Sequence, residues 1–152
     1  MRNMLRAIIV GLGMAIAATP LVAGEVVSTP DAPAAIGPYS QAIRAGNMLF
    51  LSGQGAIDPK TNVLNIDASI EDQTRLVFEN LKAVLAAGGM TTSDVVAATV
   101  FMKDLNEFTR MNAVYATYFP SAPPARQTVE VSRLPRDGKI EISLIAVKGE
   151  RE

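Results

Sequence analysis

The side chains that this sequence offers for chemistry are limited by two absences, because its 152 residues include neither cysteine nor histidine. A thiol nucleophile, a Ser-His-Asp triad and a zinc site with histidine ligands are therefore excluded. Proton transfer must depend on glutamate, aspartate, lysine, tyrosine or a bound water molecule. Without cysteine, the fold also needs no disulfide bond and does not depend on an oxidising compartment.

The elements that must position these side chains are predicted from apolar periodicity and turn signals. The first helix begins at Ser69, which forms a capping box with Asp72, and it ends at Gly88-Gly89. A second helix is expected over about 105–119. Strands are expected over 25–29, 40–43, 48–51, 94–102, 128–131 and 140–147. The strand over 94–102 is apolar enough to be buried on both faces.

This order of elements predicts an α+β fold in which two helices cover one face of a mixed sheet. Nothing remains in the chain to cover the other face, so we expect copies of the chain to associate. Asp137-Gly138 is a hairpin-type turn and predicts that the last two strands pair with each other. One domain over 25–152 accounts for all of these elements.

The first 24 residues have the pattern of a secretory signal peptide. Arg2 and Arg6 precede an uncharged apolar run over 7–18, and small residues follow at Ala23 and Gly24. The run is too short to span a bilayer comfortably. We therefore expect cleavage after Ala23 or Gly24 and a periplasmic or secreted protein, with an uncleaved membrane anchor as the alternative.

Charge argues against two classes of partner. The formal net charge of the full sequence is −1, and removal of two arginines with the signal peptide makes it about −3. A mildly acidic domain lacks the basic field that nucleic-acid binding requires. The same charge does not favour an anionic membrane surface, so we expect no nucleic acid and no membrane as partners of the mature protein.

Six segments, in one consistent order, together resemble the Rid (reactive intermediate deaminase) family, also called the YjgF type. Any one of them alone would be a weak signal, whereas all six in order are specific. They are 32–41 (APAAIGPYSQ), 51–54 (LSGQ), 100–106 (VFMKDLN), 112–115 (NAVY), 124–126 (PAR) with 129–131 (VEV), and 139–142 (KIEI).

The resemblance implies a chorismate-mutase-like α+β fold with a six-stranded sheet, and a homotrimer with clefts between subunits. It also implies hydrolysis of 2-iminopropanoate or 2-iminobutanoate to the 2-oxo acid and ammonia, without cofactor or metal. Arg126 matches the arginine that binds the substrate carboxylate, and Glu141 matches the acid that orients the attacking water. The matching cleft residues are Tyr39, Ser52, Gly53 and Asn112.

This chemistry is consistent with the residue types. The planar guanidinium of an arginine makes two parallel, charge-assisted hydrogen bonds to a carboxylate. A glutamate can accept a proton from water and return it to the departing nitrogen. Because an imine is already electrophilic, neither a metal nor a covalent nucleophile is required. Two departures from the family pattern put substrate choice in question: Thr128 replaces a frequent cysteine, and Ser143 replaces a second glutamate found in some members.

The predicted hairpin constrains how Arg126 and Glu141 can cooperate. Regular pairing around Asp137-Gly138 would place Arg126 opposite Gly149 and more than about 20 Å from Glu141. The two side chains would then meet on one substrate only across a subunit boundary. The alternative function is a non-catalytic trimer that binds small carboxylates or a protein, which would need Arg126 but not Glu141. A ribonuclease is disfavoured by the acidic charge, the lack of histidine and the export signal.

Overall fold

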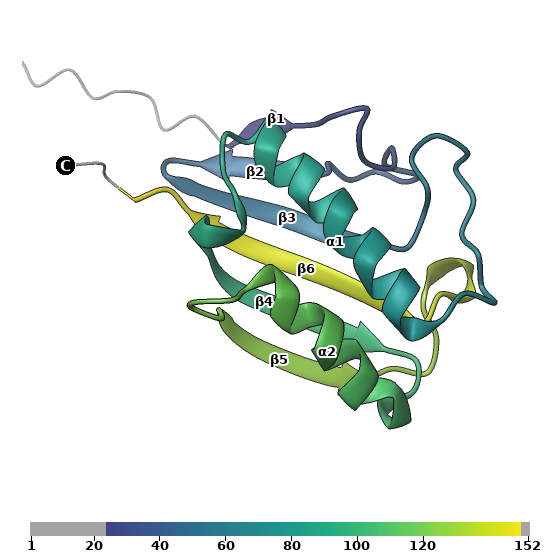
Figure 1. The fold of residues 1–152 in the computed structure, drawn as a ribbon. Helices are drawn as coiled ribbons and strands as arrows, with labels where there is room; N and C mark the ends of the chain where they lie inside the picture. The colour runs from purple at the N-terminus through teal and green to yellow at the C-terminus, as the bar shows by residue number, and fades with distance from the viewer. Residues whose placement is uncertain (1–23, 150–152) are drawn as a thin grey trace, which may run out of the picture.

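The computed structural model describes residues 24–149 as a six-stranded mixed sheet with two helices on one face (Figure 1). The strands are β1 (Glu25–Val27), β2 (Ala42–Ala45), β3 (Met48–Gly55), β4 (Val95–Met102), β5 (Ala125–Glu130) and β6 (Ile140–Val147), and the helices are α1 (Ile70–Ala87) and α2 (Phe108–Tyr118). The predicted α+β architecture is confirmed. The predicted signal peptide, apart from Gly24, lies outside the described residues.

The strand order is β1-β2-β3-β6-β4-β5, and every neighbouring pair is antiparallel except β4 and β5. The helix α2 makes the crossover from β4 to its parallel neighbour β5, which leaves β5 at the edge of the sheet. The last strand, β6, enters the middle of the sheet between β3 and β4. Residues far apart in sequence therefore form its centre.

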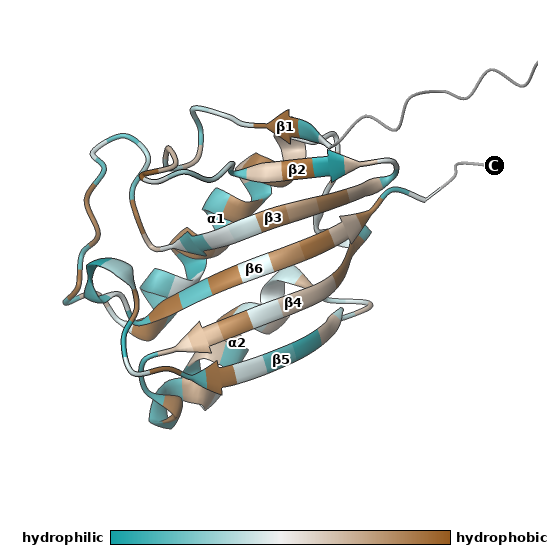
Figure 2. Cartoon of the chain, turned by 180° about the vertical axis from the view of Figure 1, so that it is seen from behind, coloured by the Kyte–Doolittle hydropathy of each residue, from teal (hydrophilic) through white to brown (hydrophobic). Residues whose placement is uncertain are grey.

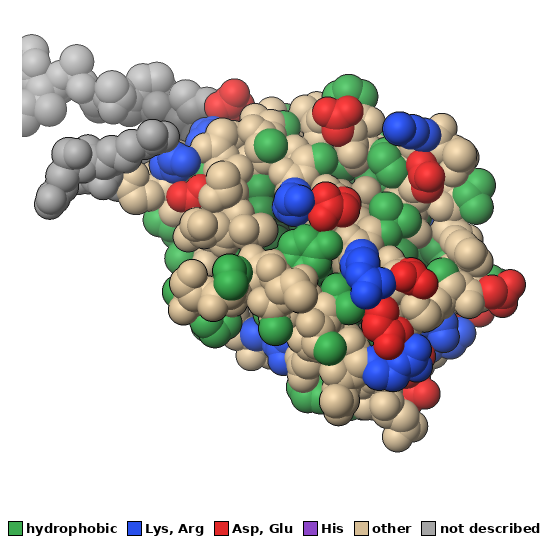
Figure 3. Space-filling view, viewed as in Figure 1, with side chains coloured by type: hydrophobic (Ala, Val, Ile, Leu, Met, Phe, Trp, Pro, Cys, Tyr) green, Lys and Arg blue, Asp and Glu red, His purple; other side chains and the backbone are tan. Residues whose placement is uncertain are grey.

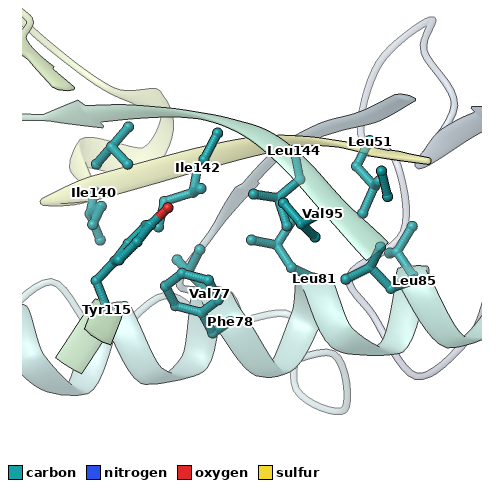
Figure 4. Close-up of a cluster of buried hydrophobic side chains, with 14 of the residues drawn as sticks. Leu51, Val77, Phe78, Leu81, Leu85, Val95, Tyr115, Ile140, Ile142 and Leu144 are labelled. Atoms are coloured by element: carbon teal, nitrogen blue, oxygen red, sulfur yellow. The ribbon is translucent and has the colours of Figure 1, made fainter. Parts of the chain in front are cut away.

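The core lies between the sheet and α1 (Figure 4). Val77, Leu81 and Leu85 form the stripe of α1 that faces the sheet, and Ile142 and Leu144 of β6 point toward it. All five are buried, because the apolar face of the helix packs against the apolar face of the strand. This packing fixes which face of each strand is turned toward the helices.

The predicted ends of α1 are confirmed. The Ser69 hydroxyl accepts a hydrogen bond from the backbone N–H of Asp72 at 3.1 Å, as an N-cap does. Gly88 is the C-cap, and Gly89 follows with a φ of 65°, which a glycine adopts without steric cost. The second helix begins later than predicted, because Leu105–Glu107 forms a separate 3-10 turn before α2.

The predicted hairpin between the last two strands is wrong, because β4 lies between β5 and β6 and pairs with both. Arg136 and Asp137 adopt left-handed backbone angles in a 3-10 turn, and the segment between the strands passes across the end of β4. The crossover through α2 had already placed β5 on the outer edge of β4. Only the inner edge of β4 was then free to receive β6.

The face of the sheet opposite the helices is uncovered in the single chain, and Figure 2 looks onto it. Phe50, Val96 and Val129 are 40 %, 46 % and 43 % exposed. The prediction that the strand over 94–102 is buried on both faces is therefore wrong for one chain. Its residues alternate between the core and this open face. Within residues 24–149, neither helix has both the length and the hydrophobicity to cross a bilayer.

Candidate active site

A β-bulge in β3 places a glycine beside Glu141. Leu51 pairs with Leu144 and Gln54 with Ile142, so β3 has one more residue than β6 over this stretch. The extra residue lies within Ser52-Gly53 and turns Gly53 toward the Glu141 side chain. A Cβ atom at Gly53 would lie 2.8 Å from Cδ and 3.0 Å from Cγ of Glu141, and even closer to Oε1. Only glycine leaves the carboxylate its present place.

Glu141 is half-buried on the open side of the sheet and borders a cavity of about 240 Å³. No hydrogen bond or ion pair within residues 24–149 engages its carboxylate. Burial raises the pKa of Glu141 above its usual value, because removal from water disfavours the charged form. A carboxylate that is sheltered, unpaired and beside a cavity is suited to exchange protons with a small molecule.

Two other predicted residues line this cavity together with Glu141. Gly53 contributes its backbone, and Tyr39 contributes a ring that is 48 % exposed. The Tyr39 hydroxyl accepts a hydrogen bond from the backbone N–H of Ile36 at 3.3 Å. We call Tyr39, Gly53 and Glu141 the glutamate half-site.

Ser52 does not line the cavity, and its polar groups instead hydrogen-bond the neighbouring backbone. Its hydroxyl donates to the backbone carbonyl of Ser40 at 2.7 Å, and its N–H donates to the carbonyl of Gln41 at 3.0 Å. These bonds connect the bulge to the segment that carries Tyr39. In the single chain, Ser52 therefore positions the two walls of the cavity relative to each other.

Gln41 is a residue that the sequence analysis did not single out. Its side chain is buried and hydrogen-bonds the preceding loop, donating to the carbonyls of Pro33 at 2.8 Å and Thr29 at 3.1 Å and accepting from the Thr29 N–H at 2.7 Å. The loop that leads to Tyr39 is thereby held in place. The available signal was a polar residue within the predicted strand over 40–43 and at the end of a motif segment.

Arg126 on β5 has an unusual environment for an arginine. Its guanidinium carbon lies 4.4 Å from the centroid of the Tyr115 ring and 5.6 Å from that of Phe108, both on α2. Within residues 24–149 it has no hydrogen bond or ion pair, whereas every other arginine there has one. Its N–H groups are therefore free for a ligand. Asn112 lies on α2 between these two aromatic residues, and we call Arg126 with Asn112 the arginine half-site.

The two half-sites lie on opposite faces of the sheet. Arg126 pairs with Ala98, which is buried beneath the helices, whereas Glu141 alternates with core residues of β6 and points to the open face. Arg126 pairs with Ala98 of β4, and Glu141 pairs with Phe101, three residues further along the same strand. Because β4 lies between β5 and β6, the two residues are also two strand spacings apart, which separates their Cα atoms by about 14 Å. The predicted separation of more than about 20 Å was too long because it assumed the hairpin. One small substrate cannot contact both side chains of the same chain.

Thr128 and Ser143, the two departures from the family pattern, lie in different surroundings. Thr128 is on the same face of β5 as Arg126. Its Oγ1 is buried and has no hydrogen-bond partner among residues 24–149, and the same is true of the Tyr115 hydroxyl. Burial raises the pKa of Tyr115, an effect that the positive charge of Arg126 partly offsets. Ser143 pairs with Thr99 on β4 and shares the open face with Glu141. Residues 24–149 hold no group of three or more carboxylates arranged to bind a metal ion.

Comparison with known proteins finds relatives that match most of this chain. Residues 29–148 match the family model described as Endoribonuclease L-PSP. A RutC family protein of Pyrococcus horikoshii is 56 % identical over 124 residues, which cover 82 % of this chain and 98 % of the relative. The 2-iminobutanoate/2-iminopropanoate deaminase of Salmonella typhimurium is 47 % identical over 127 residues, with coverage of 82 % and 98 %.

Solved structures show the same fold. The crystal structure of TdcF from Escherichia coli with bound serine has a TM-score of 0.78 and 42 % sequence identity, and the match covers 82 % of this chain and 99 % of that one. Residues 29–148, which match the family model, include every residue of the two half-sites. The chain therefore belongs to the Endoribonuclease L-PSP family, which is also called the Rid or YjgF family.

Proposed function

We propose that this protein hydrolyses reactive 2-imino acids such as 2-iminopropanoate and 2-iminobutanoate to the 2-oxo acid and ammonia. The observation that carries this proposal is that two charged side chains are partly buried and have no polar partner within residues 24–149. Arg126 is the one arginine within residues 24–149 without a polar partner, and Glu141 is a half-buried carboxylate without one. The first matches the carboxylate of a 2-imino acid, and the second matches the water that must attack it.

The reaction needs only these groups. Arg126 binds the substrate carboxylate through two parallel hydrogen bonds, which places the imine carbon. The substrate reacts as its protonated imine. Glu141 accepts a proton from water as the water oxygen bonds to the imine carbon, and the C=N electron pair moves to nitrogen to give a neutral carbinolamine. Glu141 then returns this proton to the nitrogen, the C–N bond breaks to release ammonia, and the carbinol O–H becomes the ketone as its proton passes to the released ammonia. The products are the 2-oxo acid and ammonia, and no electron is gained or lost.

Assembly is the second part of the proposal. The open face exposes Phe50, Val96 and Val129, and a second copy would remove their apolar surface from water. A symmetric trimer that covers this face would bring the arginine half-site of one subunit to the glutamate half-site of the next. This arrangement would complete a site that the single chain divides between two faces of its sheet.

Two alternative functions predict different results. A non-catalytic binder of small carboxylates would use Arg126 alone, and the serine in the TdcF structure is a small carboxylate of the same size. A ribonuclease is suggested by the family description, but this sequence has no histidine and a net charge of −1. On the helix face, acidic and basic side chains are intermingled rather than gathered into a basic patch (Figure 3). We therefore favour the deaminase.

The test generates 2-iminopropanoate with an amino-acid oxidase and traps it with semicarbazide. The active protein should slow formation of the trapped product, because it consumes the imine. Arg126→Ala and Glu141→Gln should each abolish this effect. Arg133→Ala, which removes an exposed arginine whose ion-pair distance to Asp137 is 3.8 Å, should leave it unchanged. Binding of 2-oxobutanoate without any effect on trapping would instead support the non-catalytic binder.

We also propose that the protein is exported. The support is the positive start, the apolar run and the small residues at Ala23 and Gly24. N-terminal sequencing of the protein isolated from cells should find Gly24 or Glu25 as the first residue. An intact Met1 in protein from the cytoplasm would contradict export but not the deaminase.

A further inference from the structure

The contact between Arg126 and α2 is made by aromatic rings rather than by acids. Phe108 and Tyr115 are seven residues apart, which places them on one face of α2 two turns apart. The Tyr115 ring is closer to the guanidinium, at 4.4 Å from the ring centroid, and only 5 % of Tyr115 is exposed. Arg126 thus rests on a surface that the helix supplies.

The Tyr115 ring is itself held in place. It packs edge-on against Phe78 of α1, with ring centroids 5.3 Å apart and planes at 77°, and lies 5.0 Å from Phe119. Aromatic clusters with such centroid separations are well packed and gain energy beyond the burial of their area. A ring fixed from two sides is a rigid support for a long and otherwise flexible side chain.

An aromatic contact, unlike an acidic partner, leaves the N–H donors of Arg126 available for binding. A ring attracts the face of a guanidinium, whereas the five N–H donors lie in its plane and point outward from its edge. An acidic partner would occupy these donors and neutralise the charge that a substrate carboxylate needs. The aromatic contact restrains Arg126 and leaves both its charge and its donors available.

We infer that Tyr115 is a positioning residue, whose ring holds the Arg126 guanidinium in the orientation that binds the substrate carboxylate. This inference rests on the proposed function, because it assumes that Arg126 binds a small carboxylate. The ring makes the contact that restrains Arg126, since the Tyr115 hydroxyl is buried and makes no hydrogen bond of ordinary geometry within residues 24–149, although it lies near enough to Arg126 for the positive charge to affect the Tyr115 pKa. Tyr115→Phe therefore keeps the function, and Tyr115→Leu loses part of it.

The test compares three variants of the full chain by calorimetric binding of 2-oxobutanoate, the reaction product, and by steady-state kinetics. Tyr115→Leu should raise Kd and KM roughly 5- to 30-fold, the range of a cation–π contact, with kcat within about twofold. KM should change and kcat should not, because the carboxylate is bound equally in the ground and transition states. Tyr115→Phe should match the wild type. Tyr118→Leu is the matched control, since it makes the same change on the same helix where the ring stacks on Phe78 and not on Arg126.

The outcomes separate this inference from the proposed function. Unchanged Kd in a folded Tyr115→Leu protein, or equal weakening in Tyr115→Phe and Tyr115→Leu, overturns the role of the ring while wild-type turnover still supports the deaminase. A wild-type protein that neither binds 2-oxobutanoate nor consumes imine overturns both. If Tyr115→Leu does not fold, Tyr115→Met removes the ring with less loss of volume, and the same criteria apply to it.

Discussion

Gly53→Ala adds a single methyl group at the place where β3 meets the catalytic carboxylate of the proposed mechanism. The new Cβ would lie 2.8 Å from Cδ and 3.0 Å from Cγ of Glu141, whereas ordinary carbon contacts begin near 3.5 Å. Glu141 must therefore move by about 1 Å, a displacement that can cost on the order of 100-fold in rate when it misaligns reacting groups. We expect kcat for 2-iminopropanoate to fall roughly 10- to 100-fold in the semicarbazide assay.

Two comparisons make this prediction specific. Gly55→Ala adds the same methyl group two residues further along β3, where no atom lies within 4 Å, and should have a much smaller effect. Gly53→Ala should lower the free energy of unfolding less in a Glu141→Ala background than in the wild type, because the side chain that the methyl group displaces is absent. A folded Gly53→Ala protein with wild-type kcat and KM would refute the reasoning, since Glu141 could then act from another position. An equal loss of unfolding free energy in both backgrounds would show that the methyl group collides with something other than Glu141.

The remaining predictions concern assembly and protonation. Refolding Arg126→Ala together with Glu141→Ala in equal amounts should restore about a quarter of the wild-type activity, because random assembly leaves about that share of interfaces intact; no recovery from folded mixed oligomers would reject a shared cleft. Since burial raises the pKa of Glu141, the acid limb of kcat/KM should fall above pH 4.5, and a limb at or below 4.5 would contradict this. The raised pKa also means that the folded state disfavours the charged carboxylate, so Glu141→Gln should increase the free energy of unfolding at neutral pH. Denaturant titrations should find this gain shrinking as the pH falls through the raised pKa, where the wild-type carboxyl becomes neutral.

The elements whose ends depend on residues close together in the sequence were predicted well. The α1 helix begins at Ser69 and ends at Gly88-Gly89 because a cap, an apolar stripe and a glycine stop act within a few residues of one another. Strand boundaries were less accurate: β5 begins at Ala125 rather than at 128, and β3 continues to Gly55 rather than to 51. A strand ends where its neighbours stop pairing with it, and those neighbours are distant in sequence.

In the candidate site, too, some features depend on residue types and short motifs, whereas others depend on contacts between distant segments. The lack of cysteine and histidine left proton transfer to Glu, Asp, Lys, Tyr or bound water, and the resemblance carried by the motif segments identified Arg126 and Glu141 as the candidates. The bulge that leaves room only for Gly53, and the aromatic support that Tyr115 provides, were not visible in the sequence. Each depends on contacts between strands or between a helix and a strand, for which no short spacing is a signature.

What the sequence determined by itself was therefore the residue types available for chemistry, the α+β class, the two helices and the residues that match the family. Tertiary structure alone decided that β6 enters between β3 and β4, and that Arg126 and Glu141 consequently point to opposite faces of one sheet. The turn at Asp137-Gly138 was compatible with a hairpin, but a turn governs only a few residues. Once α2 had placed β5 on the outer edge of β4, the free inner edge and the apolar alternation of β6 determined where the last strand paired.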